Sequence, residues 1–189
     1  PKSGTATQAI TIRALDATSK PVIDGEYTLP LGAPVNMNKP FYSNTTCAEF
    51  WEDSNANQGP APKQACFAWA YLVTINASYV VWDGIDLTRS RGHGLLIGRY
   101  GPPAPYPQSV AFRHSEIGHI RNEGVYIAGV TNVSFRANSV HDTNDFAAYS
   151  RGAPNIVWSG NTPTFYGGGP GWSGGVYQRY TEDIELIDN

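Results

Sequence analysis

A short alternating pattern of apolar residues is repeated along the chain, and this repeat constrains the fold more than any other feature. Segments beginning at Val80, Val110, Val133, Ile156 and Ile184 align without gaps at intervals of about 25 residues. The first and third residues of each segment are apolar, whereas the second and fourth are mixed or polar. This period of two is typical of a β-strand with one buried face. A unit this short cannot bury that face alone, so we expect consecutive units to stack as a solenoid with parallel strands.

A second apolar patch follows three of these strands, at residues 94–97, 124–127 and 147–150. Gly, Asn or Asp residues precede each patch, as a turn requires. We therefore expect at least two short strands in each unit, joined by a polar bend. If units stack, equivalent side chains lie above one another, and the rings of Trp82, Phe112 and Phe135 form one hydrophobic pillar.

The repeat, together with the phrase AITIRALDATSKPVIDG at residues 9–25, resembles the right-handed parallel β-helix proteins. That family includes pectate lyase and the alginate and chondroitin lyases. The resemblance implies an all-β fold, a right-handed parallel β-helix (solenoid), with loop insertions. In the family the phrase lies in early coils after a capping segment, which is missing here, and the sequence stops in mid-strand at IELIDN. We expect the chain to be part of a longer protein or to be completed by self-association, because open ends expose strand edges.

The repeat predicts a single domain over residues 1–189 that is interrupted by loops. Its expected parts are a first coil at 9–25, a loop at 26–70, and regular coils at 71–189 with insertions at 99–108 and 164–180. Loops on a rigid scaffold commonly carry function. Aromatic rings around a groove stack on sugars, and the candidates for this role are Tyr126, Tyr149 and Trp172. The other interpretation of the loop aromatics is burial in small local cores.

Composition narrows the class of protein and its compartment. Gly 20, Pro 14 and only 15% charged residues favour strands and turns, and a net charge of −3 does not indicate a nucleic-acid binder. No apolar run is long enough for a membrane span. Cys47 and Cys66 are predicted to form a disulfide, although two unpaired thiols remain the alternative. The disulfide and the sequons at Asn44, Asn76 and Asn132 favour a secreted or cell-surface glycoprotein.

Stacking converts sequence offsets into columns of side chains. The fourth position of the repeated strand forms a column of Asp83, Arg113, Arg136 and Ser159. Arg113 and Arg136 are candidate substrate-binding residues, because two guanidinium groups can grip the carboxylate of a uronate. The alternative is a surface ion ladder, in which Asp83 pairs with Arg113 and Glu116 and Arg136 continue the series.

A second group of polar residues lies in the expected bend before the second apolar patch. Its members that could cluster on one edge are His119, Arg121, Glu123, His141, Asp142 and Asp145. One use is acid–base chemistry on a sugar, with His119, Arg121 and His114 as catalytic candidates. Another is a Ca²⁺ site formed by Asp142, Asn144 and Asp145. The third is a polar turn whose Asn and Asp side chains bind their own backbone.

These observations lead to two hypotheses about function. The first is an exported polysaccharide-binding or polysaccharide-processing β-helix, which resembles a lyase that cleaves acidic polysaccharide by β-elimination. The lysine base used by some lyases of this fold has no counterpart in the regular coils, since the four lysines are Lys2, Lys20, Lys39 and Lys63. The second hypothesis is a non-catalytic extracellular structural, adhesive or fibre-forming β-helix.

Overall fold

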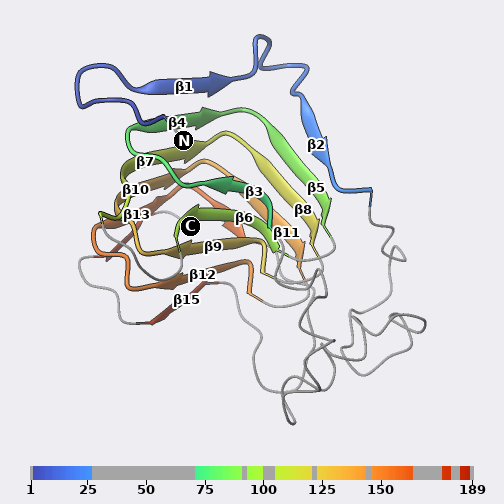
Figure 1. Ribbon diagram of the computed structural model, residues 1–189. Coiled ribbons are helices and arrows are strands. Elements are labelled where there is room, and N and C mark those ends of the chain that lie inside the picture. Colours follow the sequence, from blue (N-terminus) through green and yellow to red (C-terminus); the bar gives the residue numbers. More distant parts are fainter. Residues whose placement is uncertain are drawn as a thin grey trace, which may run out of the picture.

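The computed structural model, which describes residues 2–26, 71–90, 93–99, 105–120, 123–143, 146–163, 176–179 and 184–187, is a parallel β-helix of three sheets (Figure 1). Sheet 1 contains β1 (Ile10–Arg13), β4 (Val80–Asp83), β7 (Gln108–Arg113), β10 (Thr131–Arg136), β13 (Ile156–Ser159) and β16 (Ile184–Ile187). Sheet 2 contains β2 (Val22–Asp24), β5 (Asp86–Ser90), β8 (Glu116–Ile120), β11 (Ser139–Thr143) and β14 (Thr162–Pro163). Sheet 3 contains β3 (Tyr71–Ile75), β6 (His93–Gly98), β9 (Val125–Ala128), β12 (Ala148–Arg151) and β15 (Val176–Arg179).

The chain visits the three sheets in turn, so that each coil adds one strand to every sheet (Figure 1). All paired strands run parallel, as the stacking of equivalent units predicts. The first coil consists of β1, β2 and β3, and residues 25–70 separate its second strand from its third. The expected fold class is therefore confirmed, with three strands in each coil.

The aromatic pillar predicted from the repeat is present in the core. Trp82 pairs in register with Phe112, and Phe112 with Phe135. Their ring centroids lie 5.8 Å and 5.4 Å apart with nearly parallel planes. Trp158 continues the column at 4.7 Å from Phe135. All four side chains are buried. The stacked rings therefore form the part of the core that packs against sheet 1 and stabilises it.

The first residues of the polar segments expected to form a bend, among them His119 and Asp142, belong to strands instead. These strands are β5, β8 and β11, three of the five strands of sheet 2. Each contains a residue with positive φ, namely Arg89, His119 or Asp142. Because of this kink, inward side chains lie three residues apart, as Ile117 and Ile120 do in β8, and both are buried. The pattern therefore lacks the period of two by which the other strands were recognised.

The predicted insertion at 164–180 is also shorter than expected, because Val176–Arg179 forms β15 and pairs with β12. Similarly, the insertion at 99–108 ends where β7 begins at Gln108. Several predictions concern residues outside the described part of the chain. These residues are Asn44, Cys47, Cys66, Arg121, Asn144, Asp145 and Trp172.

Candidate functional site at the corner between sheets 1 and 2

At the corner between sheets 1 and 2, the turn residues of successive coils form a column. Their backbones adopt the left-handed conformation, with positive φ. Gly84, His114, Ala137 and Gly160 have φ values of 70°, 55°, 51° and 59°. The two glycines adopt this conformation without strain, whereas a residue with a β-carbon does so at some cost. His114 is the one member of this column with a side chain larger than a methyl group. The corner therefore presents an imidazole among small neighbours.

After the turns at Ala137 and Gly160, the next residue is an asparagine whose side chain points inward and satisfies the buried backbone. The Asn138 amide nitrogen Nδ2 donates to the Phe112 carbonyl at 3.1 Å, and its Oδ1 accepts from the Ser115 N–H at 3.0 Å. Asn161 repeats the arrangement one coil later, donating to the Phe135 carbonyl at 2.9 Å and accepting from the Asn138 N–H at 3.0 Å. Asn138 and Asn161 are buried, so this asparagine ladder supports the corner from the inside.

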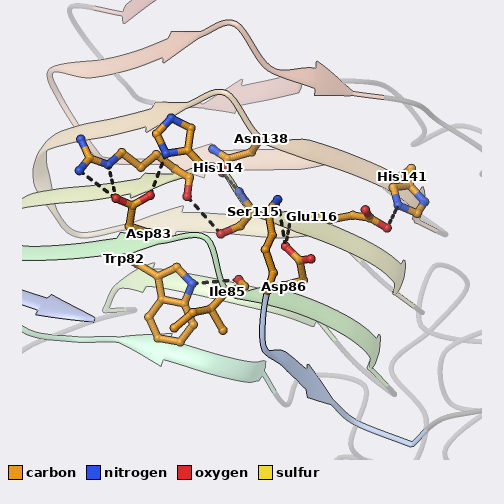
Figure 2. A network of polar contacts seen from close by, with 11 residues as sticks. Trp82, Asp83, Ile85, Asp86, His114, Ser115, Glu116, Asn138 and His141 are labelled. Carbon is orange, nitrogen blue, oxygen red and sulfur yellow. Dashed lines mark hydrogen bonds and ion pairs between the residues drawn. The ribbon is translucent and has the colours of Figure 1, made fainter. Parts of the chain in front are cut away.

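Asp83, at the end of β4, binds two side chains of the next coil (Figure 2). Its Oδ2 accepts from Arg113 Nε at 3.1 Å and lies 2.9 Å from Arg113 Nη2. Its Oδ1 lies 2.7 Å from His114 Nδ1. Partial burial opposes ionisation, but the hydrogen bonds from His114 and Arg113 prevail and lower the pKa of Asp83 below its ordinary value. Asp83 is therefore an ionised carboxylate that accepts from both groups.

Arg113 and Arg136 lie in register on adjacent strands, as the column predicted, but they have different partners. Arg113 is bound to Asp83. Arg136 is exposed, and its Nε donates to Ser134 Oγ on the same strand at 2.8 Å. No carboxylate of the described residues forms an ion pair with Arg136. The structure thus supports the Asp83–Arg113 part of the ion ladder and leaves Arg136 available for an external anion.

A second polar cluster lies on the outer face of sheet 2, away from His114 (Figure 2). His141 Nε2 is 2.9 Å from Glu116 Oε1, and His141 Nδ1 is 3.0 Å from Asp142 Oδ2. Burial lowers the pKa of His141, but its hydrogen bonds to the two carboxylates outweigh burial and raise that pKa above its ordinary value. The ring lies on Gly118, where a β-carbon would come within 2.5 Å of His141 Cε1.

His119 belongs to this second cluster, not to the corner. Its Nδ1 lies 3.5 Å from Asp142 Oδ2, and its ring meets that of His141 edge-on at 5.8 Å between centroids. The structure therefore brings together His119, His141 and Asp142 of the predicted edge. It places Glu123 elsewhere, because that carboxylate pairs with buried His93, with Oε2 and Nδ1 2.5 Å apart.

The structure does not test the calcium prediction. Asp142 is already engaged with His141, while Asn144 and Asp145 lie outside the described residues. Within the described ranges, no three His, Cys, Asp or Glu side chains are grouped so that they could hold a metal ion. The Ca²⁺ site remains a prediction.

The two predicted sugar-binding tyrosines of sheet 3 stack on each other, with Tyr126 and Tyr149 ring centroids 4.8 Å apart. Tyr126 is only 7% exposed and packs with Leu96 in a cluster beside Tyr71. As placed, it contributes to packing and has little surface for a ligand. The third candidate, Trp172, is outside the described residues.

Sequence reasoning did not find two contacts of polar side chains. Asp83 was expected to pair with Arg113, but its bond to His114 was not foreseen, although His114 directly follows Arg113. His93 and Glu123 occupy equivalent positions in successive coils, and this equivalence was the available signal for their pairing. Tyr71 stacks on His93 at 4.6 Å, and Tyr126 meets the same ring edge-on at 5.9 Å, so His93 and Glu123 pack with the aromatic residues of sheet 3.

Comparisons with known proteins do not indicate a function for this chain. The chain matches no protein-family model, no curated protein and no solved structure. Among the residues that the structure describes, no helix has the length and apolar character needed to cross a membrane.

Proposed function

We propose that the protein is an exported β-helix that binds and cleaves acidic polysaccharide at the corner between sheets 1 and 2. The observation that carries the proposal is the exposed imidazole of His114, 57% exposed and held by Asp83, beside a column that contains the exposed Arg136. A base and a carboxylate-binding cation are the two groups that β-elimination from a uronate requires.

The reaction would proceed as follows at this corner. Arg136 would bind the uronate carboxylate through charge-assisted hydrogen bonds. His114 Nε2 would take the proton from the carbon next to that carboxylate, and the electron pair would form a carbon–carbon double bond. The glycosidic carbon–oxygen bond would break, and the leaving oxygen would take a proton from water. Arg136 would also stabilise the negative charge that develops on the carboxylate.

The geometry of the corner supports a polymeric ligand. The column Asp83, Arg113, Arg136 and Ser159 runs along the stack of coils, with one residue in each layer. Layers of a parallel sheet are about 4.8 Å apart. A linear chain lying along the stack would therefore meet several layers at once. The small residues on both sides of His114, Gly84 and Ala137, leave room beside the imidazole.

The expected place of action is outside the cell or at its surface. Support comes from the predicted Cys47–Cys66 disulfide and from the sequons, of which the one at Asn132 has an exposed asparagine. A Ca²⁺ held by Asp142, Asn144 and Asp145 would bind acidic groups of the polymer at sheet 2, away from His114.

The test is incubation with alginate, pectate and glycosaminoglycans while following the ultraviolet absorbance of the conjugated alkene. His114→Gln should lower kcat by about 10²- to 10⁴-fold, the usual contribution of a general base. His119→Asn is the matched histidine variant, because His119 lies in the sheet 2 cluster, and it should retain activity. Absence of alkene formation on every polymer, or equal losses in the two variants, would exclude His114 as the base of a lyase.

A specific observation also favours the second hypothesis, a structural β-helix that associates with itself. Apolar side chains of the first and last strands of sheet 1 are exposed: Ile10 36%, Ile12 42%, Leu186 60% and Ile187 42%. Parallel strand edges with apolar side chains can pair with another chain. Sedimentation velocity over a range of concentrations tests this: reversible multimers without any polymer cleavage would favour the structural role.

A further inference from the structure

We infer that Asp83 is a positioning residue that fixes His114 with its proton on Nδ1 and its lone pair on Nε2, and that it thereby separates the roles of the two corner arginines. Arg113 binds and orients Asp83, whereas Arg136 is the arginine of this pair that binds the ligand. The catalytic consequences rest on the proposed function, but the tautomer of His114 and the division between the arginines are properties of the protein itself.

The tautomer follows from the chemistry of the two partners. Asp83 Oδ1 lies 2.7 Å from His114 Nδ1, within hydrogen-bond distance. An ionised carboxylate can only accept, so Nδ1 must carry the hydrogen, and in the neutral ring Nε2 then has the lone pair. No described residue hydrogen-bonds to Nε2, and the side chain is 57% exposed. The nitrogen that can act as a base is therefore the one that faces solvent.

Arg113 completes the orientation of the carboxylate. Its Nε and Nη2 both lie near Asp83 Oδ2, at 3.1 Å and 2.9 Å, which leaves Oδ1 for the imidazole. A carboxylate held through one oxygen by a planar guanidinium cannot rotate freely. The same contact engages the guanidinium of Arg113, so binding an external carboxylate there would compete with Asp83.

Arg136 occupies the equivalent position one coil later, yet it has no acid beside it. Its register partner on β13 is Ser159, and its hydrogen bond goes to Ser134. The difference between the two arginines arises from the neighbouring coil: Asp83 lies below Arg113, whereas Arg113 lies below Arg136. A negatively charged ligand would relieve the repulsion between the two guanidinium groups. Arg136 could donate to such a ligand, because its ion-pairing capacity is not used by an acid of the described residues.

The first arm of the test is long-range ¹H–¹⁵N correlation spectroscopy of the imidazoles at alkaline pH, with His119 as an internal reference. We expect His114 to show the Nδ1–H tautomer in the wild-type protein and in Arg113→Gln. Asp83→Ala should shift it to the Nε2–H form that a free imidazole prefers. Circular dichroism verifies that each variant is folded. A wild-type Nε2–H tautomer, or an unchanged tautomer in Asp83→Ala, would overturn the inference whether or not the protein cleaves a polymer.

The second arm compares the arginines kinetically on the polymer that is cleaved. Arg136→Gln should raise KM by about tenfold, because it removes a charged hydrogen-bonding partner of the ligand. Arg113→Gln should leave KM within about twofold and lower kcat by about tenfold through looser orientation of His114, and Asp83→Ala should lower kcat further, by about 10²-fold. Asn155→Ala, at the opposite end of the sheet 1 strands, should change neither constant. Equal increases in KM for both arginine variants would refute the division of roles.

If the spectroscopic result is as expected and no polymer is cleaved, the inference about Asp83 stands and the proposed lyase activity fails. The affinity of the two arginine variants for the intact polymer then replaces the kinetic comparison. In that measurement Arg136→Gln should weaken binding by about tenfold, and Arg113→Gln by less than about twofold. The opposite order would overturn the assignment of Arg136 as the ligand-binding arginine.

Discussion

The inner and outer sides of the corner between sheets 1 and 2 follow different rules, although their residues are adjacent in sequence. Inside, Asn138 and Asn161 repeat the same hydrogen bonds from coil to coil and satisfy the buried backbone. Outside, the side chains change in every coil, and only one coil carries an imidazole, that of His114. The difference shows that repetition marks what the fold requires, whereas the departure from repetition marks where chemistry can be placed.

The same contrast holds along sheet 1. Its inward column consists of large apolar rings in every central coil, from Trp82 to Trp158. The column of strand ends varies in charge and in partners: Asp83 binds Arg113, whereas Arg136 has no acid beside it among the described residues. We therefore expect substitutions on the inner side to reduce stability, and substitutions on the outer side to change activity with little effect on stability.

The largest expected effect on stability comes from the pillar. Phe112→Ala should lower the free energy of unfolding by about 3–5 kcal/mol, because the ring is fully buried between two aromatic neighbours and its removal leaves a cavity. Val157→Ala, on the outward side of β13, is the control and should cost less than about 1.5 kcal/mol. Urea denaturation measures both variants. Equal losses would mean that inward and outward positions of sheet 1 do not differ.

The next largest effect comes from the asparagine ladder. Asn138→Ala removes the donor to the Phe112 carbonyl and the acceptor for the Ser115 N–H, both buried. The expected loss is about 2–3 kcal/mol, because two buried backbone groups lose their partners. The exposed pair Asn132–Asn155 supplies the control, since Asn155→Gly breaks a surface amide contact without straining the backbone at φ 58° and should cost less than about 0.5 kcal/mol. A small effect at Asn138 would show that water replaces the ladder.

Two of the three sheets could be predicted from the sequence, and the third could not. The pillar and sheets 1 and 3 follow from the apolar pattern, since Trp82, Phe112 and Phe135 recur at the same position of each unit. Sheet 2 could not be recognised in the same way. A left-handed residue in each of β5, β8 and β11, such as His119, displaces the inward positions from a period of two. Three-residue spacing in a polar segment resembles a loop unless the backbone conformation is known.

The candidate site was only partly predictable for a different reason. Strand register follows from the repeat, so the vertical neighbours Asp83, Arg113 and Arg136 were placed correctly. Partner choice depends on side-chain direction at the turn, and sequence does not reveal that Asp83 reaches across to His114 as well. Glu123 was wrongly expected to cluster with His119 for the same reason, because its side chain turns inward to His93.

The cluster on sheet 2 predicts a smaller, pH-dependent effect. Folding raises the pKa of His141, so the protonated ring stabilises the native state fully below its ordinary value of 6.5, and this contribution is lost as the pH rises through the raised pKa. The difference in unfolding free energy between wild type and His141→Gln should be up to about 1 kcal/mol near pH 5.5 and should shrink at alkaline pH. Denaturation at several pH values measures it.

His119→Gln is the control for that experiment, because His119 lies 3.5 Å from Asp142 at the edge of the cluster and makes fewer contacts. A difference for His141→Gln that grows with rising pH would have the wrong sign and would contradict the bridging of Glu116 and Asp142 by a protonated ring.

The smallest expected effect on stability comes from His114 itself, and it gives the sharpest contrast with its inner neighbours. His114→Gly relieves a β-carbon at φ 55°, a gain of about 1 kcal/mol, and this gain is offset by a more flexible unfolded chain and by loss of the exposed contact with Asp83. Ala137→Gly makes the same backbone change one coil later without losing that contact. The difference between the two variants therefore measures the Asp83–His114 interaction, and we expect it to be below about 1 kcal/mol.

Thermal and urea denaturation would show His114→Gly close to wild type while polymer cleavage is abolished. A large loss of stability would instead make His114 part of the scaffold, and the outer side of the corner would then follow the same rule as the inner side.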